Sequence, residues 1–253
     1  MRYIRTIIWF IYFFLYLIFV LPKTSKLKKL TEQGKIEERD AYLRKTVYKW
    51  ATRLMRLAGV KVNVTGKENL PDGPALFVSN HQGLYDIPVL LTSLDKPNGF
   101  IAKKEAKKIP FVPTWMDYLG CVFIDRENPR EAVKALHEAA DKIKSGYSII
   151  IFPEGTRSKS DNMGQFKGGA FKIAEKTRVP IVPVLLDGTY KIMEANKNWM
   201  VPGTVNVTIL PPIDTTDLTK ADFKTLGPEI KASLENTLSL IHISEPTRLA
   251  LIS

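Results

Sequence analysis

The feature that most constrains the fold is an alternation, beyond Gly59, of short β-branched runs with helical patterns and Gly or Pro breaks. Parallel strands need crossover connections, which are usually helices, so this alternation predicts an α/β fold. We expect a mixed, largely parallel sheet covered by helices on both faces, with functional residues at the carboxyl ends of its strands. The expected strands are residues 75–79, 121–124, 148–152, 181–186 and 205–209.

The strongest helix signal lies between the second and third of these strands. Asn128 is a favourable N-cap residue, Pro129 suits a first helical turn and Gly146 suits a helix end. We therefore predict a helix over residues 128–146, whose apolar face consists of Ala132, Val133, Leu136, Ala139, Ala140 and Ile143.

Residues 7–21 form an unbroken run of fifteen apolar or aromatic residues with basic residues on both flanks. These flanks favour a membrane segment. As a helix at about 1.5 Å per residue, the run covers roughly 22 Å, short of a hydrocarbon core of about 30 Å. Spanning the bilayer and entering one leaflet therefore both stay open. A cleaved signal peptide is the alternative, but no small-x-small cleavage site follows the run.

Residues 41–58 show an amphipathic helical pattern in which apolar residues recur every three or four positions and basic residues fill other positions. Such a helix either lies on an anionic membrane surface or packs on the rest of the protein. The preceding apolar run favours the membrane surface. The apolar positions are Leu43, Val47, Trp50, Leu54 and Leu57.

The overall charge is strongly basic. Lys and Arg number 37 against 26 Asp and Glu, which predicts attraction to phospholipid head groups, phosphorylated ligands or nucleic acid. The lysines are dispersed and no nucleic-acid motif accompanies them, so we expect no nucleic-acid partner. Cys121 is the one cysteine, so no internal disulfide can form and a reducing compartment is favoured. Its apolar neighbours indicate core packing.

The first candidate motif, residues 79–86, follows an expected strand and contains His81 and Asp86. Pro88 marks a helix start, which puts Asp86 at a helix N-terminus and His81 on the preceding loop, where the two can pair. A histidine can take a proton from a hydroxyl, and an adjoining carboxylate would fix its tautomer and stabilise the imidazolium. No Gly-x-Ser-x-Gly elbow is present, so the substrate's own hydroxyl would attack. Taken alone, a helix cap beside an unrelated histidine explains such a pair better.

The second candidate motif, residues 152–158, reads Phe-Pro-Glu-Gly-Thr-Arg-Ser and follows the most apolar strand. Gly155 permits a tight turn that presents Glu154 and Arg157 at the carboxyl end of the strand. With Lys167 and the two glycines after it, this turn predicts a phosphate cradle of guanidinium, ammonium and backbone N–H groups, and hence an anionic substrate. An ordinary Glu-Arg surface turn is the alternative.

Four segments of this kind occur in order: residues 80–86, residues 120–126 (Gly-Cys-Val-Phe-Ile-Asp-Arg), residues 152–158 and residues 179–184 (Val-Pro-Ile-Val-Pro-Val). Together they closely resemble the four sequence blocks of the glycerolipid acyltransferase family, and most closely the 1-acylglycerol-3-phosphate acyltransferases. Four ordered blocks are far more specific than any one of them. The resemblance implies a glycerol-3-phosphate acyltransferase-like fold.

The resemblance also implies an activity, the transfer of a fatty acyl group from a thioester to the free sn-2 hydroxyl of 1-acylglycerol-3-phosphate, without a covalent enzyme intermediate. It makes His81 the general base and Asp86 its partner in a His-x4-Asp motif. Lys103 lies in a segment that resembles the family's basic stretch near the phosphate, and Lys167 belongs to the cradle predicted above. The residues implied to bind and orient the glycerol phosphate are Arg126, Glu154, Gly155, Thr156 and Arg157.

Domain organisation follows from these assignments. We expect membrane-associated helices over residues 1–58, a catalytic domain over residues 59–240, and a tail of doubtful origin over residues 241–253 that resembles vector read-through as readily as a natural end. The family has a similar membrane-anchoring helical pair. Membrane lipids and lysophosphatidic acid are the expected partners, at the cell membrane, with the catalytic domain facing the cytoplasm because thioester donors are cytoplasmic.

Several alternatives stay open. The donor is a coenzyme A or an acyl carrier protein thioester, with no other cofactor and no metal expected. Glycerol-3-phosphate or another lysophospholipid could replace the acceptor. A metal-dependent hydrolase would need His81, Asp86 and Glu154 as ligands, since the other histidines, His137 and His242, lie on the predicted helix and in the tail. A non-enzymatic protein that binds anionic lipids is the remaining possibility.

Overall fold

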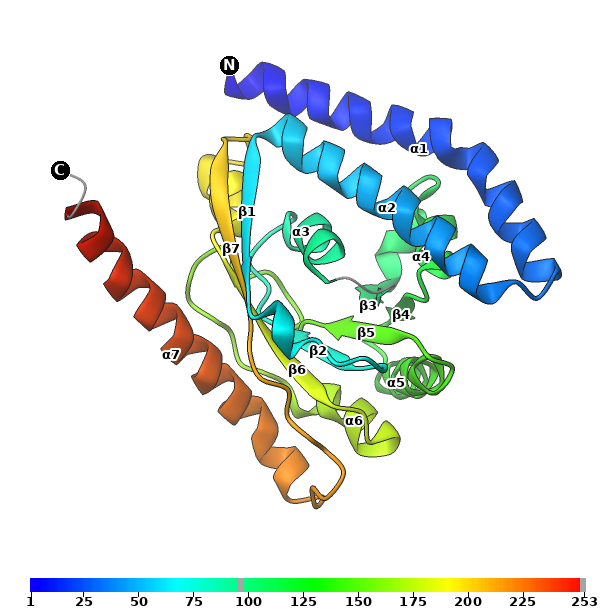
Figure 1. Cartoon of the computed structure of the whole chain (residues 1–253), viewed down its shortest axis with the longest axis vertical. Coiled ribbons are helices and arrows are strands. Elements are labelled where there is room, and N and C mark those ends of the chain that lie inside the picture. Colours follow the sequence, from blue (N-terminus) through cyan, green and yellow to red (C-terminus); the bar gives the residue numbers. More distant parts are fainter. Residues whose placement is uncertain (95–97, 251–253) are drawn as a thin grey trace.

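The computed structural model, which describes residues 1–94 and 98–250, has a sheet of seven strands in the order β1-β7-β6-β2-β5-β3-β4 (Figure 1). Neighbouring strands are parallel, except that β6 and β7 are antiparallel. The predicted mixed, largely parallel sheet is confirmed. The strands are β1 (Val60–Thr65), β2 (Leu76–Ser79), β3 (Asn98–Lys103), β4 (Val122–Ile124), β5 (Ser148–Ile151), β6 (Ile181–Asp187) and β7 (Gly203–Ile209).

Two strands, β1 and β3, were not predicted. In β1, valines alternate with polar residues over one short stretch that follows a helix directly, so the pattern is weak. β3 begins with Asn98 and Gly99, which are poor strand formers, yet it pairs with both β5 and β4. A Cβ atom at Gly99 would lie 2.4 Å from the carbonyl oxygen of Gly120, so close backbone approach requires glycine there.

Helices cover both faces of the sheet, as predicted (Figure 1). Each face has its own buried apolar cluster, one shared with the helices between residues 2 and 118 and the other with the helices between residues 129 and 250. The predicted helix over 128–146 is confirmed as α5 (Pro129–Lys144), and the Asn128 side chain accepts hydrogen bonds from its first backbone N–H groups. On its predicted apolar face Val133 is instead exposed, and Ala135, which was not predicted there, is buried. The bounds are α3 (Asp86–Ser93), α4 (Val112–Tyr118), α5 (Pro129–Lys144), α6 (Lys172–Thr177) and α7 (Asp222–Ala250).

The N-terminal segment forms two helices, α1 (Arg2–Glu32) and α2 (Ile36–Ala58), which pack lengthwise on each other (Figure 1). One side of α1 is buried, and its Trp9 Nε1 donates a hydrogen bond to the backbone oxygen of Leu54, 2.9 Å away. Within the described residues, α1 is the one helix long and apolar enough to cross a membrane, by length and composition. Its other side exposes Ile4, Ile7, Ile8, Ile11, Phe14, Leu15, Ile18 and Phe19.

The amphipathic pattern over residues 41–58 belongs to α2. Leu43, Val47 and Leu54 are buried against the protein, and α2 contacts α1 and α3. The favoured expectation, that this apolar face lies on a membrane, is therefore wrong, because α1 and the domain already cover it.

Two further expectations concern Cys121 and the tail. Cys121 is buried, its sulfur accepts a hydrogen bond from the backbone N–H of Phe100, and burial raises the pKa of the thiol to about 12, which agrees with core packing. The backbone of α7 continues to Ala250, although no helical period was recognised from residue 241 onward. Residues 251–253 lie outside the described residues, and the doubtful origin of the tail stays a prediction.

Candidate active site

The two candidate motifs meet because β2 and β5 are adjacent parallel strands, whose carboxyl ends lie at the same edge of the sheet. The loop after β2 carries His81, and the loop after β5 carries residues 152–158. Backbone hydrogen bonds join the loops, from Ser158 N–H to the His81 oxygen (2.8 Å) and from Lys159 N–H to the Gln82 oxygen (3.1 Å). The predicted location at strand ends is thus observed.

His81 and Asp86 form the predicted pair, with 2.6 Å between His81 Nδ1 and Asp86 Oδ2. Asp86 is the first residue of α3, and its side chain is fully buried, while the His81 side chain is 19% exposed. An ionised carboxylate only accepts hydrogen bonds, so the pairing assigns the hydrogen to Nδ1 and leaves His81 Nε2 with a free lone pair. The geometry therefore suits a general base.

Asp86 accepts several further hydrogen bonds, which hold its side chain in place. Oδ2 also accepts from the backbone N–H groups of Gln82 (2.7 Å) and Gly83 (3.0 Å), and Oδ1 accepts from the Thr189 hydroxyl. A buried carboxylate with this many donors is stabilised in one orientation. Thr189 lies two residues after the end of β6 and was not predicted, although strand ends were the expected location of functional residues.

Other residues missed in the sequence fix the His81 loop from two sides. The Phe152 ring stacks on the His81 ring at 4.1 Å between centroids. The Asn80 side chain exchanges hydrogen bonds with the backbone of Leu186 in β6, at 2.9 and 2.8 Å. The Gln82 side-chain oxygen accepts from the backbone N–H groups of residues 188 and 189. The loop is therefore tied to the ends of both β5 and β6.

Glu154, which was predicted to contact the substrate phosphate, instead contacts backbone groups of the protein. The residue is 6% exposed, and its two carboxylate oxygens accept hydrogen bonds from the backbone N–H groups of His81 (2.7 Å) and Gly164 (2.8 Å). Burial raises the pKa of Glu154, and these two hydrogen bonds lower it, with burial the larger effect. Glu154 thus holds the His81 loop, and an anionic group occupied in this way is a poor ligand for phosphate.

Cationic side chains converge on Gly155, which has a φ of +76°. A Cβ atom built there would lie 3.3 Å from Lys167 Nζ and 3.4 Å from Arg126 Nη1. The Arg157 side chain is 42% exposed and pairs with Glu194 at 3.0 Å. Arg126, which the resemblance implied, and Lys167, which the cradle interpretation predicted, therefore both lie close to the Gly155 turn.

A cavity of about 500 Å³ opens beside these residues. Its walls combine charged groups with apolar and aromatic side chains from α1 to α4, including Trp9, Phe13, Tyr16, Trp50 and Trp115. A space of this kind accommodates both an anionic group and a hydrocarbon chain. The predicted site residues that line it are His81, Lys103, Arg126, Gly155, Thr156 and Arg157, and within the described chain Asp86, Glu154 and Lys167 lie outside its lining.

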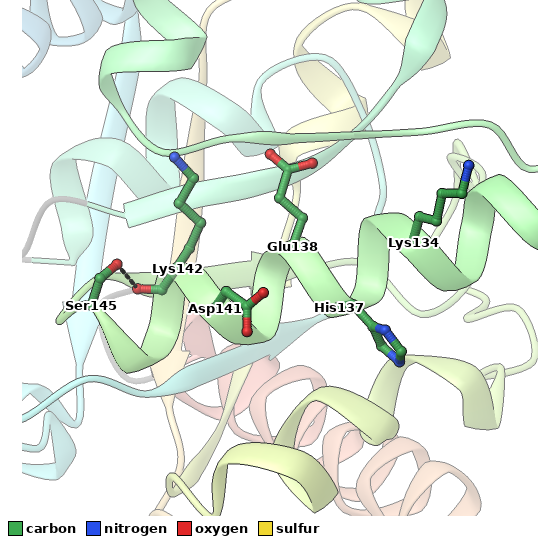
Figure 2. A pocket seen from close by; sticks show the side chains of 6 residues that line it. All are labelled: Lys134, His137, Glu138, Asp141, Lys142 and Ser145. Atoms are coloured by element: carbon green, nitrogen blue, oxygen red, sulfur yellow. Dashed lines mark hydrogen bonds between the residues drawn. The ribbon is translucent and has the colours of Figure 1, made fainter.

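A second hollow lies along the surface of α5 (Figure 2). It contains none of the predicted site residues, and its side chains project from a single helix, among them His137. No group of three His, Cys, Asp or Glu side chains arranged to hold a metal ion occurs in the part of the chain that the structure describes. The lining consists of Lys134, His137, Glu138, Asp141, Lys142 and Ser145.

The sequence of the chain is similar to those of known acyltransferases. The profile of the family described as Acyltransferase matches residues 61–187. A chloroplast 1-acyl-sn-glycerol-3-phosphate acyltransferase of Arabidopsis thaliana is 45% identical over 156 residues, which cover 60% of this chain and 44% of the relative. The Saccharomyces cerevisiae 1-acyl-sn-glycerol-3-phosphate acyltransferase is 32% identical over 191 residues, covering 74% of this chain and 63% of the relative. The chain thus spans less than two thirds of these relatives' lengths.

A solved structure is similar over nearly the whole chain. The crystal structure of the 1-acyl-sn-glycerophosphate acyltransferase PlsC from Thermotoga maritima has 31% sequence identity and a TM-score of 0.74, covering 96% of this chain and 98% of that one. The family profile covers half of the chain, and this structural match covers nearly all of it. The chain therefore belongs to the acyltransferase family.

Proposed function

We propose that the protein transfers a fatty acyl group from an acyl thioester to the free sn-2 hydroxyl of 1-acylglycerol-3-phosphate, giving phosphatidic acid. The observation that carries this proposal is the His81–Asp86 pair beside a cavity that combines cations with apolar walls. The names of the relatives, 1-acyl-sn-glycerol-3-phosphate acyltransferases, support the same reaction.

In the proposed mechanism, His81 Nε2 takes the proton from the acceptor hydroxyl as its oxygen attacks the thioester carbonyl carbon. The C–O bond forms and a tetrahedral oxyanion results. Its collapse breaks the C–S bond, and the imidazolium returns the proton to the departing thiolate. Asp86 stabilises the imidazolium between these steps, and no covalent enzyme intermediate is needed.

The cations around Gly155 fit the acceptor phosphate. Arg157 and Arg126 line the cavity with His81, so a phosphate bound to them would bring the adjoining glycerol hydroxyl toward the base. Lys103, Lys167 and Thr156 complete the proposed anion site. Glu154 contributes indirectly, because it holds the backbone of His81.

We also propose that α1 attaches the protein to the membrane within one leaflet. The helix packs lengthwise on α2 by one side and exposes a continuous apolar side, which suits a helix lying in the interface better than one crossing the bilayer alone. The cell membrane, with the catalytic domain facing the cytoplasmic thioester pool, follows as the proposed location.

The test uses detergent-solubilised protein with acyl-coenzyme A or acyl carrier protein donors and a panel of lysophosphatidate, glycerol-3-phosphate and lysophosphatidylglycerol, following both thiol release and lipid product. We expect product from lysophosphatidate, and a fall in kcat of roughly 10²- to 10⁴-fold for His81→Ala. His137→Ala, a histidine on α5 outside the site, is the matched control.

Three results would contradict parts of this proposal. Thiol release without acylated lipid would favour a thioesterase, and product from glycerol-3-phosphate alone would change the acceptor. Activity that is lost on chelation and restored by added metal would favour the metal-dependent alternative.

A further inference from the structure

Glu194, which lies outside the four sequence blocks, is an acidic residue whose side chain is buried. It lies in a short 3-10 turn, η5 (Glu194–Asn196), beyond the end of β6, and its side chain is 2% exposed. Burying a carboxylate costs free energy unless charged or hydrogen-bonded partners compensate it. The partners of Glu194 therefore indicate why the chain holds it there.

One oxygen of Glu194 joins two loops of the active site. Oε1 accepts a hydrogen bond from the backbone N–H of Leu84 at 2.7 Å and from Arg157 Nη1 at 3.0 Å. Leu84 belongs to the loop between His81 and Asp86, whereas Arg157 belongs to the loop after β5. A single carboxylate thus connects the base-bearing loop to a cation of the proposed phosphate site.

The neighbouring glycine shows how closely this carboxylate packs on the loop. A Cβ atom at Gly83 would lie 2.6 Å from Glu194 Oε2, a distance that real Cβ atoms do not reach. Oε2 itself is buried and has no hydrogen-bond partner among the described residues. Glu194 is therefore held by its contact with the loop, although only one of its two carboxylate oxygens accepts hydrogen bonds from the described residues.

We propose that Glu194 is a positioning residue, which holds the Arg157 guanidinium at a fixed place relative to His81. This inference rests on the proposed function. A guanidinium has five N–H donors, so one bond to Glu194 leaves others free to bind a phosphate. Ordering a long side chain before the ligand arrives lowers the entropy cost of binding. The Leu84 bond fixes this arrangement relative to the base.

The test compares Glu194→Ala, Arg157→Ala and the double variant with a short-chain lysophosphatidate as acceptor. We expect Glu194→Ala to raise KM for lysophosphatidate roughly three- to tenfold and to leave KM for the thioester donor unchanged. In the Arg157→Ala background it should raise the acceptor KM no further, because the two residues act as a unit. Glu194→Gln keeps an accepting oxygen and should recover part of the loss.

Glu131→Ala is the matched control, since Glu131 pairs with Lys134 on the exposed side of α5. A wild-type protein that transfers no acyl group to lysophosphatidate, or an Arg157→Ala variant with unchanged KM, would overturn the proposed function or phosphate site and this inference with it. If Arg157→Ala raises KM but Glu194→Ala does not, or if the two effects add, the inference alone is wrong. A loss shared equally by donor and acceptor, with lower thermal stability, would also overturn it.

Discussion

The replacement Asp86→Asn tests the proposed charge pair without removing its hydrogen bonds. An asparagine can direct its carbonyl oxygen to the three donors that now share Asp86 Oδ2, namely His81 Nδ1 and two backbone N–H groups. Its amide NH₂ would then face Thr189, whose hydroxyl can rotate and accept. The His81 tautomer and the fold should therefore persist, and the change removes mainly the negative charge.

The size of the effect follows from the distance between the charges. Two unit charges about 4 Å apart interact by about 4 kcal/mol at an effective dielectric constant of about 20. That interaction exists only once His81 is an imidazolium, so its loss raises the barrier to acyl transfer. At about 1.4 kcal/mol per power of ten, kcat should fall by roughly 10²- to 10³-fold.

The assay follows thiol release and phosphatidic acid formation at saturating substrates, together with thermal unfolding of each protein. Asp214→Asn is the control, because Asp214 is an exposed aspartate that accepts hydrogen bonds from Thr216 outside the site. A kcat within threefold of wild type at unchanged stability would refute the role of the Asp86 charge. A large fall in melting temperature would instead show that asparagine cannot satisfy the four donors.

Three further predictions follow from the contacts of the site. Thr189→Val removes the donor to Asp86 Oδ1 and should lower the free energy of unfolding by about 1–3 kcal/mol in urea denaturation, with Thr189→Ser restoring it. Gly83→Ala would bring a Cβ within 2.6 Å of Glu194 and displace that side chain. Acyl transfer measured in the same assay should therefore fall, with only a small change in melting temperature. Burial raises the pKa of Glu154, so its contribution to stability is fully present below about pH 4.5 and is lost as pH rises through the native pKa. The stability of wild type relative to Glu154→Gln should therefore decrease from pH 4.5 upward in thermal unfolding, and a constant difference would contradict this.

Residues whose partners lie nearby in sequence were predictable. Asn128 caps the helix that begins one residue later, so local turn chemistry sufficed there. His81 and Asp86 are five positions apart, so their spacing allowed a pair, and the family resemblance then favoured it. The strand order of the sheet was not predictable in this way, because pairing between distant strands depends on packing of the whole domain. β3 shows this, since it starts with two poor strand formers and is held by neighbours on both sides.

The residues of the site also differ in whether their partners are near or distant in sequence. The second motif and the family resemblance both identified Glu154, but its role depends on His81, which is 73 residues away in sequence and donates a backbone N–H. Thr189 and Glu194 belong to no recognised block, and their partners lie more than 30 residues away. A carboxylate or hydroxyl that acts on distant backbone groups leaves no local spacing to detect, so these residues emerge only from the fold.

Three neighbouring strand ends supply different parts of the candidate site. β2 leads to the base, β5 leads to Arg157 and the Phe152 ring, and β6 leads to Thr189, which donates a hydrogen bond to Asp86. α1 also lines this cavity, and the ring of its Trp9 lies 5.8 Å, between centroids, from the ring of Tyr85, the residue before Asp86. The opposite side of α1 is the exposed apolar surface. Because one helix carries both surfaces, a change that shifts α1 as a whole alters the cavity wall beside the catalytic loop and the proposed membrane contact together.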